Sequence, residues 1–279
     1  MPAIKSLAMP FGDLRRKLDQ SIVYDWAMRF PIMIYCVLLL GHDVVKFSQQ
    51  VAEDPAAFQQ FDTGAYVAML ARISQWMFVI LLSIQPLFRL RPIAKSEELL
   101  PRVAALLAVT LPLTYMLLER APPNLAFNLI AVVLSVVANV MALVTASFLG
   151  RSLSVMPEAR RLVQGGPYGL VRHPLYLFEI LATAAVALQY RSLLAVGLLL
   201  LAIVLQVARA RWEEGVLARV LPDFAVYRAQ TPFLIPRDPV HFLASFVMDA
   251  AVRRRAALVV ASMVAVLALL ASVLPRLMA

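Results

Sequence analysis

Cysteine and histidine are scarce in this chain. Only one of its 279 residues is cysteine and three are histidine. A single cysteine excludes an intrachain disulfide and a cysteine-based metal cage. Cys36 lies inside the apolar run PIMIYCVLLLG and is expected to be a buried structural thiol. His42, His173 and His241 lack the HxxxH and HExxH spacings, so the sequence predicts no metal site.

Charge is also scarce, whereas apolar residues are abundant. Charged residues make up 15% of the chain and hydrophobic residues 62%, with a mean hydropathy of +0.79. Soluble domains contain about 45–50% apolar residues, so the composition indicates an integral membrane protein. The net charge of +9 comes without a basic stripe that carries interleaved aromatic residues, and we therefore expect no nucleic-acid partner. Basic residues that flank membrane spans and contact lipid headgroups explain the charge better.

The apolar runs predict an all-α, polytopic membrane helix bundle. A helix that spans a membrane needs about 20 mostly apolar residues. The chain contains seven candidate spans, at 29–47, 66–88, 103–119, 124–149, 174–190, 192–208 and 256–274. The first is interrupted by Pro31 and ends in the polar residues 41–43. The second contains Arg72 and Gln75, which are expected to face the bundle interior.

The distribution of arginine and lysine predicts the orientation of these spans. When seven spans are threaded in turn, one side receives most of the basic residues: Arg15, Arg16, Lys17, Arg29, Arg89, Arg91, Lys95, Arg102, Arg151, Arg160, Arg161, Arg172, Arg209, Arg211, Arg219, Arg253, Arg254 and Arg255. The other side receives the acidic loop with Glu53, Asp54 and Asp62. By the positive-inside rule, the N-terminus is expected in the cytoplasm and the C-terminus on the opposite side.

The chain is expected to form a single integral membrane domain. Residues 1–28 lack the apolar region of a cleavable signal peptide and are predicted to form an interfacial amphipathic segment. They are followed by a four-span bundle over 29–150, a core over 151–240 with a helical hairpin and a cytoplasmic cap, and a linker with an extra span over 241–279. The segment 209–255 is too short and too rich in proline to form a separate domain.

A tight helical hairpin is predicted where only the letters YRS separate the fifth and sixth spans. Two helices of similar length, rising about 1.5 Å per residue, return the chain to the membrane face from which it started. Arg209 is therefore expected on the same face as Arg172 and His173, although more than thirty residues separate them in sequence.

The first polar cluster is the stretch GGPYGLVRHPLY, residues 165–176. Pro174 suits the first position of a helix, with His173 as its cap. The free N–H groups at such a helix start attract carboxylate or phosphate. Gly165 and Gly166 permit close approach of a ligand, but they form no GxGxxG motif and no strand precedes them. The simpler alternative is a turn whose Arg172 reaches the lipid headgroups.

The second polar cluster is RARWEEGVLARV, in which Arg209 and Glu213 are four residues apart. On a continuous helix they share one face. An ordinary ion pair on a solvated helix is the simpler interpretation, although the adjacent Glu213 and Glu214 at a membrane boundary call for a cationic partner.

Taken in order, these pieces resemble a known family. GGPYGLVRHPLYLFEI, a short helical hairpin, RARWEEGVL, FAVY and TPFLIP resemble the isoprenylcysteine carboxyl methyltransferase family and its bacterial relatives, a group that includes phospholipid N-methyltransferases. The resemblance covers roughly 160–237. It implies a membrane methyltransferase, in the inner membrane of a bacterium, whose cytoplasmic segment closes over S-adenosylmethionine while a lipophilic substrate enters from the membrane.

The resemblance also implies roles for individual residues. The cofactor would be bound by Leu162, Val163, Gly166, Tyr168, His173, Tyr176 and Glu214, with Arg172 suited to its carboxylate. Arg209 and Glu213 would lie beside the methyl acceptor. An arginine suits a carboxylate acceptor and a glutamate base suits an amine acceptor, so this pair leaves the acceptor open.

One position departs from the family pattern, because Phe178 stands where glycine is common, next to Glu179. The larger ring is expected to narrow the cofactor or substrate passage. An NADPH-dependent reductase of the sterol reductase type is a second hypothesis, which Glu179 keeps open and Leu175, in place of asparagine, disfavours. A non-enzymatic membrane bundle is the third, and the gathering of polar residues at one end of the spans speaks against it.

Overall fold

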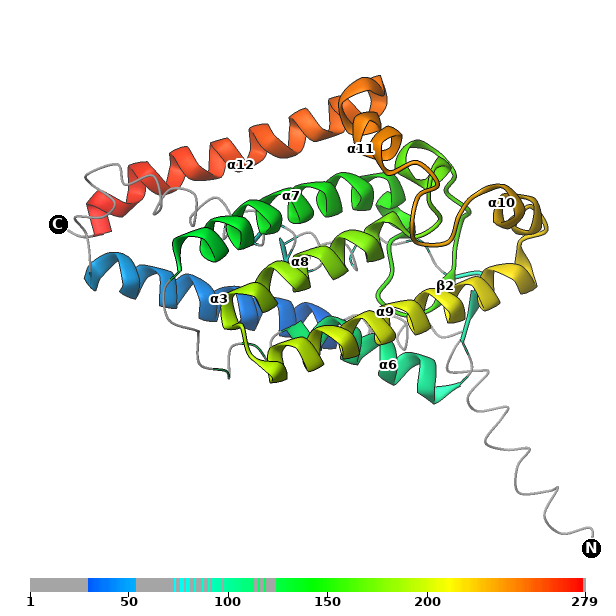
Figure 1. The fold of residues 1–279 in the computed structure, drawn as a ribbon, viewed down its shortest axis with the longest axis horizontal. Helices are drawn as coiled ribbons and strands as arrows, with labels where there is room; N and C mark the ends of the chain where they lie inside the picture. Colours follow the sequence, from blue (N-terminus) through cyan, green and yellow to red (C-terminus); the bar gives the residue numbers. More distant parts are fainter. Residues whose placement is uncertain are drawn as a thin grey trace, which may run out of the picture.

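The protein is mostly helical in the computed structural model (Figure 1). The structure describes residues 30–53, 73, 76, 77, 79, 80, 83, 87, 90, 92–96, 98–112, 115, 118 and 124–277. The expected interfacial segment 1–28 and most of the expected second span, including Arg72 and Gln75, lie outside the described residues.

Long helices run side by side along the longest axis of the molecule (Figure 1). The described helices are α3 (Phe30–Glu53), α6 (Leu99–Thr110), α7 (Leu125–Leu149), α8 (Pro174–Tyr190), α9 (Leu193–Val220), α10 (Phe224–Gln230), α11 (Pro239–Met248) and α12 (Ala250–Leu277). Helix α8 packs against both α7 and α9, α6 packs against α9, and α12 packs against α7 and α11. The expectation of a helical bundle is confirmed.

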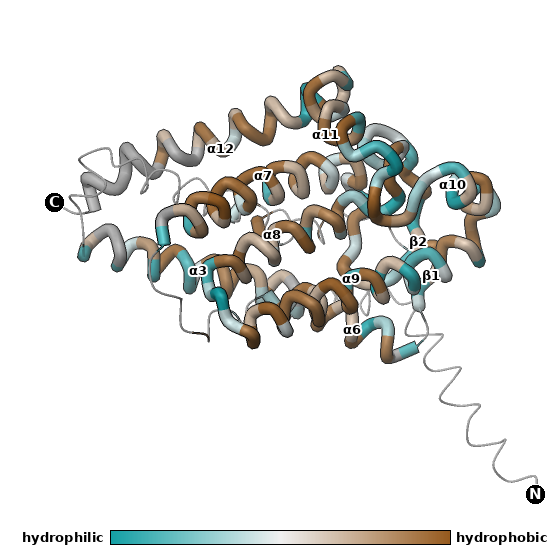
Figure 2. Tube along the Cα trace, viewed as in Figure 1, coloured by the Kyte–Doolittle hydropathy of each residue, from teal (hydrophilic) through white to brown (hydrophobic). Residues whose placement is uncertain are grey.

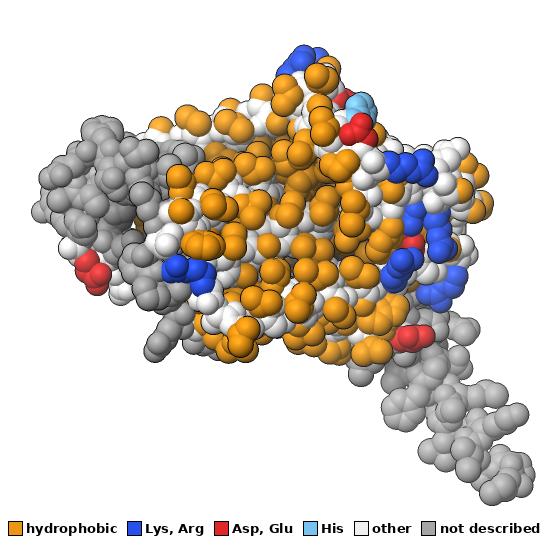
Figure 3. Space-filling model, in the orientation of Figure 1, with side chains coloured by type: hydrophobic (Ala, Val, Ile, Leu, Met, Phe, Trp, Pro, Cys, Tyr) orange, Lys and Arg blue, Asp and Glu red, His pale blue; other side chains and the backbone are white. Residues whose placement is uncertain are grey.

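Two described helices are long and apolar enough to cross a membrane. The stretches that meet this test are Ala126–Ser152 and Leu193–Val220, which correspond to α7 and α9. Brown, apolar segments dominate α7, α8 and α9 in Figure 2, and on the face drawn in Figure 3 hydrophobic side chains cover the middle of the molecule. On α9, Leu193, Leu200 and Val204 are 93%, 58% and 62% exposed, as expected for contacts with lipid. The count of seven spans is not confirmed.

The hairpin of α8 and α9 follows from local sequence signals. Pro174 occupies the first turn of α8, where its missing N–H has no cost. Helix α8 ends at Tyr190, and its C-cap residue Arg191 adopts a left-handed conformation with φ 43°. The Ser192 side chain then accepts a hydrogen bond of 3.1 Å from the backbone N–H of Ala195 and caps α9. The predicted hairpin is therefore present, and α9 continues well past the predicted end of the sixth span.

The predicted end of the first span is wrong. Helix α3 runs from Phe30 to Glu53, through the polar residues that were expected to end the first span. Pro31 lies in its first turn, where proline is tolerated, and the carboxylate of Asp43 accepts a 2.7 Å hydrogen bond from the Trp76 indole. The third span was expected to run to residue 119; α6 ends at Thr110, and most of 113–119 lies outside the described residues.

A small sheet was not predicted. Strand β1 (Ala94–Lys95) pairs antiparallel with β2 (Glu158–Ala159), and Ala94 is opposite Ala159. The pairing continues through a 3.1 Å hydrogen bond from Ser96 N to Pro157 O, and a separate 2.8 Å hydrogen bond from Leu90 N to Arg151 O joins the same two loops. Backbone groups of two loops satisfy each other in this way. The contact fixes the segment between α7 and α8, which carries part of the site, against the loop before α6.

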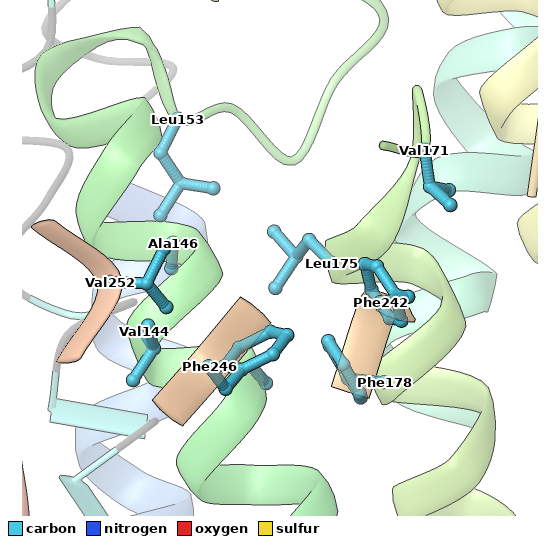
Figure 4. Packing of buried hydrophobic residues seen from close by; sticks show 10 residues of the cluster. Val144, Ala146, Leu153, Val171, Leu175, Phe178, Phe242, Phe246 and Val252 are labelled. Atoms are coloured by element: carbon cyan, nitrogen blue, oxygen red, sulfur yellow. The ribbon is translucent and has the colours of Figure 1, made fainter. Parts of the chain in front are cut away.

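Aromatic and aliphatic side chains close the core between α7, α8, α11 and α12 (Figure 4). The Phe178 ring stacks on Phe242 at a centroid distance of 5.8 Å and meets Phe246 edge to face at 5.6 Å. Arg255 of α12 donates to both oxygens of Ser147, and its guanidinium lies 4.1 Å from the ring centroid of Phe148. Helix α12, which contains the predicted seventh span, thus holds α11 and the end of α7 together.

Gly166 provides a test of this packing. Its φ of +60° disfavours any side chain, and a Cβ there would lie 2.4 Å from the Phe148 ring. We expect Gly166→Ala to lower the free energy of unfolding by about 2 kcal/mol or more, through backbone strain and overpacking. The neighbouring Gly165 has a φ of −87°, and a Cβ added there would meet nothing within 4 Å, so Gly165→Ala is the matched control. Thermal unfolding of both variants in detergent measures the difference, and equal midpoints would contradict the assigned role.

Candidate functional site

The motif GGPYGLVRHPLY lies at the polar end of the bundle. Residues Gly166–Gly169 form the short 3₁₀ helix η3, and α8 begins at Pro174. The backbone N–H groups of Arg172 and His173 donate to the carbonyls of Pro232 and Phe233, at 2.9 and 3.2 Å. These two N–H groups are therefore engaged by the loop after α10 and do not face a ligand. The loop TPFLIP, which resembled the family pattern, serves as the partner of the motif.

Glu214 is the centre of a buried ionic cluster. Its Oε1 lies 2.7 Å from Arg172 Nε and 3.2 Å from His173 Nε2, and its Oε2 lies 3.8 Å from Arg228 Nε. The side chains of Arg172 and Glu214 are 8% and 4% exposed. Arg172 Nη1 also donates to the carbonyls of Arg228 and Thr231. Glu214 of α9 and its partner Arg172 thus connect the start of α8 with the C-terminal end of α10.

Glu213, on the adjacent position of α9, has different partners. The Tyr176 hydroxyl donates a 2.5 Å hydrogen bond to Glu213 Oε2. The Tyr176 ring is stacked on His173 at 5.3 Å, with an interplanar angle of 3°. The guanidinium of Arg209 also packs on the Tyr176 ring, 4.5 Å from the ring centroid. The expectation that Arg209 returns to the face of Arg172 and His173 is confirmed.

Arg209 is 2% exposed and bonds to residues that the sequence did not single out as its partners. Its Nη1 lies 3.5 Å from Glu179 Oε2 and 3.4 Å from Gln206 Oε1, and its Nη2 donates to Ser154 O at 3.0 Å. Gln206 Nε2 donates to Glu179 Oε2 at 2.7 Å. Gln206 and Glu179 are polar residues inside apolar helices, and that rarity was the signal that could have identified them.

A first cavity of about 60 Å³ lies beside these groups. Seven of the ten predicted site residues line it: Leu162, Val163, Tyr168, Arg172, His173, Tyr176 and Glu213. Gly166, Arg209 and Glu214 are not among its lining residues. Gly166 instead packs against Phe148, Glu214 holds Arg172 and His173, and Arg209 packs behind Tyr176.

Two tyrosines shape this cavity. The Tyr227 hydroxyl donates a 2.6 Å hydrogen bond to the carbonyl of Tyr168. Burial, assisted by the negative charge of Glu213, raises the pKa of the Tyr168 phenol well above its usual range, and burial also raises the pKa of Tyr227. Both phenols are therefore protonated donors at neutral pH. The buried Tyr168 hydroxyl has no hydrogen-bond partner in the described part of the chain, although buried donors are nearly always satisfied.

A second cavity of about 130 Å³ lies within the bundle. Apolar side chains from α3, α6, α7 and α8 form most of its wall, and Glu179 and Gln206 are among its polar residues. The residues that line it are Tyr35, Cys36, Leu39, Val79, Ala108, Val109, Pro112, Ser135, Asn139, Ala142, Glu179, Ala182, Thr183, Val186 and Gln206. Arg209 contacts Tyr176, which lines the first cavity, and Glu179, which lines the second. A layer of Tyr176 and Arg209 therefore separates the two cavities.

Phe178 lines neither cavity. Its ring is 1% exposed and belongs to the core beneath α11. The expectation that it narrows a ligand passage is not supported by this position, because the larger ring fills the space between α8 and α11. In the part of the chain that the structure describes, no group of three His, Cys, Asp or Glu side chains is placed to hold a metal ion.

The comparisons with known proteins concern the same part of the chain. Residues 124–223 match the family model described as phospholipid methyltransferase. This match supports the family that the motifs indicated. It begins at the cap of α7 and ends at the turn before α10, so it includes both helices of the hairpin and every residue of the ionic cluster except Arg228.

Two curated proteins are similar over a shorter stretch. The cobalt-zinc-cadmium resistance protein CzcN of Cupriavidus metallidurans is 40% identical over 77 residues, which are 27% of this chain and 36% of that protein. The nickel-cobalt-cadmium resistance protein NccN of Alcaligenes xylosoxydans xylosoxydans is 33% identical over 81 residues, which are 29% of this chain and 38% of that protein. The chain thus spans just over a third of the length of these relatives.

The buried cluster predicts the effect of removing its charge. Glu214→Gln keeps the size of the side chain but leaves Arg172 and His173 without their buried carboxylate. We expect the free energy of unfolding to fall by about 3 kcal/mol, the usual cost of breaking one side of a buried ion pair. Asp223→Asn alters an exposed carboxylate without a side-chain cap bond and should change it by less than about 0.5 kcal/mol. Chemical unfolding followed by circular dichroism compares the two, and similar losses would refute the role of Glu214.

Proposed function

We propose that this protein is an S-adenosylmethionine-dependent methyltransferase that acts on a lipophilic acceptor at the cytoplasmic face of a membrane. The observation that carries the proposal is the coincidence of the family match with the first cavity. Every residue that lines this cavity, except Phe224 and Tyr227, lies within residues 124–223. The first cavity therefore lies almost entirely within the segment that matches the family.

The residues of the first cavity fit a methyl-donating sulfonium. A sulfonium cation is attracted by a carboxylate and by aromatic faces, and Glu213, Tyr176 and His173 supply both in the wall. The Tyr168 hydroxyl is a donor without a partner in the described part of the chain, suited to an acceptor atom of the ligand. Arg172 is already bound by Glu214, so the exposed Arg161 on the cavity wall is the better candidate for the ligand carboxylate.

The chain's own residues supply placement for the transfer. When bound, S-adenosylmethionine supplies an electrophilic methyl group that a nucleophile displaces in line, a reaction that depends chiefly on orientation. Glu214 holds His173 in place, His173 stacks on Tyr176, and Tyr176 in turn fixes Glu213. Arg209 packs against Tyr176 in this assembly, and this contact supports the place beside the methyl acceptor that the family resemblance implied for Arg209 and Glu213.

The membrane and the basic loops support the rest of the proposal. Helix α9 exposes apolar side chains along its first half and carries the site on its second half, so a lipid-soluble acceptor can reach the site along the bundle. The site lies among the arginine-rich segments that the positive-inside rule assigns to the cytoplasm. The acceptors in view are a carboxylate of a prenylated cysteine-like or isoprenoid compound and a lipid amine. The family match does not favour the reductase or the non-enzymatic hypothesis.

Calorimetric titration of the purified protein in detergent tests the cofactor. We expect S-adenosylmethionine to bind, because the first cavity offers a carboxylate to its sulfonium. S-adenosylhomocysteine should bind through the groups that the two molecules share, and NADPH should not bind. Binding of NADPH without binding of either methionine-derived ligand would replace the methyltransferase proposal with the reductase hypothesis.

Tyr168→Phe tests the orientation of the ligand in the first cavity. The change removes only an unpartnered hydroxyl, so it should leave the stability unchanged while weakening S-adenosylmethionine binding by about fivefold, the value of one hydrogen bond. Tyr115→Phe is the matched control, because the Tyr115 hydroxyl donates to Ala195 O at 2.8 Å outside the site. The control should lower the stability and preserve the affinity. Unchanged affinity in Tyr168→Phe would exclude a contact between this hydroxyl and the ligand.

A further inference from the structure

The second cavity is larger and more apolar than the first, and no described residue lines both cavities. It lies among α3, α6, α7 and α8, and its polar groups include the carboxylate of Glu179 and the amide of Gln206. Both residues are in contact with Arg209, behind which lie Tyr176 and the first cavity. An apolar chamber that ends in a few convergent polar groups has the form of a site for a lipophilic molecule with one polar head.

Glu179 retains hydrogen-bonding capacity toward this chamber. Both of its bonds, from Gln206 and from Arg209, reach the same oxygen, Oε2. In the described part of the chain, no bond reaches Oε1, and the side chain is 14% exposed, lining the chamber. A carboxylate oxygen only accepts hydrogen bonds, so a ligand group beside it must carry a proton.

Arg209 is poorly placed to attract an anion into the chamber. Arg209 is not among the residues that line the chamber, and its Nη1 and Nη2 donate to Glu179, Gln206 and Ser154. Its Nε has no hydrogen-bond partner in the described part of the chain but is buried, so the fork of Nε and Nη2 that could hold a carboxylate does not line the chamber. Its one positive charge also faces two carboxylates, Glu179 directly and Glu213 through Tyr176. The group therefore carries a net negative charge, which repels an anionic head and favours a cationic or neutral donor.

We propose that the second cavity binds the methyl acceptor. Glu179 restricts the acceptor to lipophilic molecules that carry a proton on the nucleophilic atom, such as an alkyl amine. A lipophilic carboxylate is excluded. This inference rests on the proposed function and goes further, since it chooses between the two acceptor classes that the Arg209–Glu213 pair left open. It also makes Glu179, rather than Phe178, the residue that selects the substrate.

The transfer step assigns a proton to Glu179. As the amine nitrogen forms its bond to the methyl group, the bond from that methyl group to sulfur breaks, and its electron pair stays on sulfur as a neutral thioether. Because the amine binds as the ammonium ion, Glu179 accepts one proton from it before this step, which frees the lone pair of the nitrogen. The methylated product keeps its positive charge as an alkylammonium ion, and Glu179 releases its proton to solvent before the next turnover. A carboxylate acceptor has no such proton to lose, so the Glu179 carboxylate would have no proton to accept in that reaction.

The test compares two probes of equal chain length, decylamine and decanoic acid, in equilibrium binding to the purified full chain in detergent without a methyl donor. We expect the amine to bind at least about tenfold more tightly than the acid, as a charge-assisted hydrogen bond allows. Glu179→Gln should reduce this preference to about threefold or less, because the amide removes the charge. Glu98→Gln is the matched control, since Glu98 is exposed and lies outside both cavities, and it should preserve the preference.

Two further measurements locate the site and separate this inference from the methyltransferase proposal. Ala182→Leu fills part of the chamber and should weaken both probes by about tenfold, while S-adenosylmethionine binding, measured by calorimetry, stays as in the wild type. With labelled S-adenosylmethionine, decylamine should be methylated and decanoic acid should not.

Equal or stronger binding of the acid, or a preference that survives Glu179→Gln, overturns the role of Glu179 even when S-adenosylmethionine binds. Probe binding that Ala182→Leu does not change overturns the chamber as the acceptor site. Amine selectivity without any binding of S-adenosylmethionine overturns the methyltransferase proposal instead and leaves the chamber as an amine site.

Discussion

The buried carboxylate of Glu214 is the group on which the polar end of this bundle depends. A charged side chain that is almost wholly removed from solvent needs cationic partners, and Glu214 has Arg172 and His173 from the start of α8 and Arg228 from α10. These partners also fix the backbone, because Arg172 donates to the carbonyls of Arg228 and Thr231. The segment after α10 is thereby held over the start of α8, where the first cavity lies.

From this cluster the contacts pass in sequence through the site. His173 stacks on Tyr176, Tyr176 donates to Glu213 and receives the guanidinium of Arg209 on its face, and Arg209 reaches Glu179. The series begins beside a polar cavity and ends at an apolar one. A reaction between a polar methyl donor and a lipid-soluble acceptor needs such a boundary, since each molecule requires a different solvent-like environment and both must meet at one point.

Much of the helical framework could be predicted because its signals are local. Pro174 marks the start of α8, Ser192 caps α9, and the length of the apolar runs predicted the hairpin between them. The order of the motifs indicated the family, and the return of α9 brought Arg209 to Arg172 and His173. The prediction failed where the signal was not local: α3 passes through residues 41–43 because Asp43 has a partner on another segment, and β1 and β2 form only because two distant loops meet.

The sequence by itself thus determined the helical class, the hairpin and most of the residues that line the first cavity. Only the tertiary structure decided what each of the adjacent glutamates does, because neighbouring positions on a helix point in directions about 100° apart and so meet different partners. Glu214 turns to the buried arginine and Glu213 to Tyr176 and the cavity. The same geometry placed Phe178 in the core and Glu179 in the second cavity. Which side of a helix meets which neighbour depends on packing across the whole bundle, and no local pattern of residues contains that information.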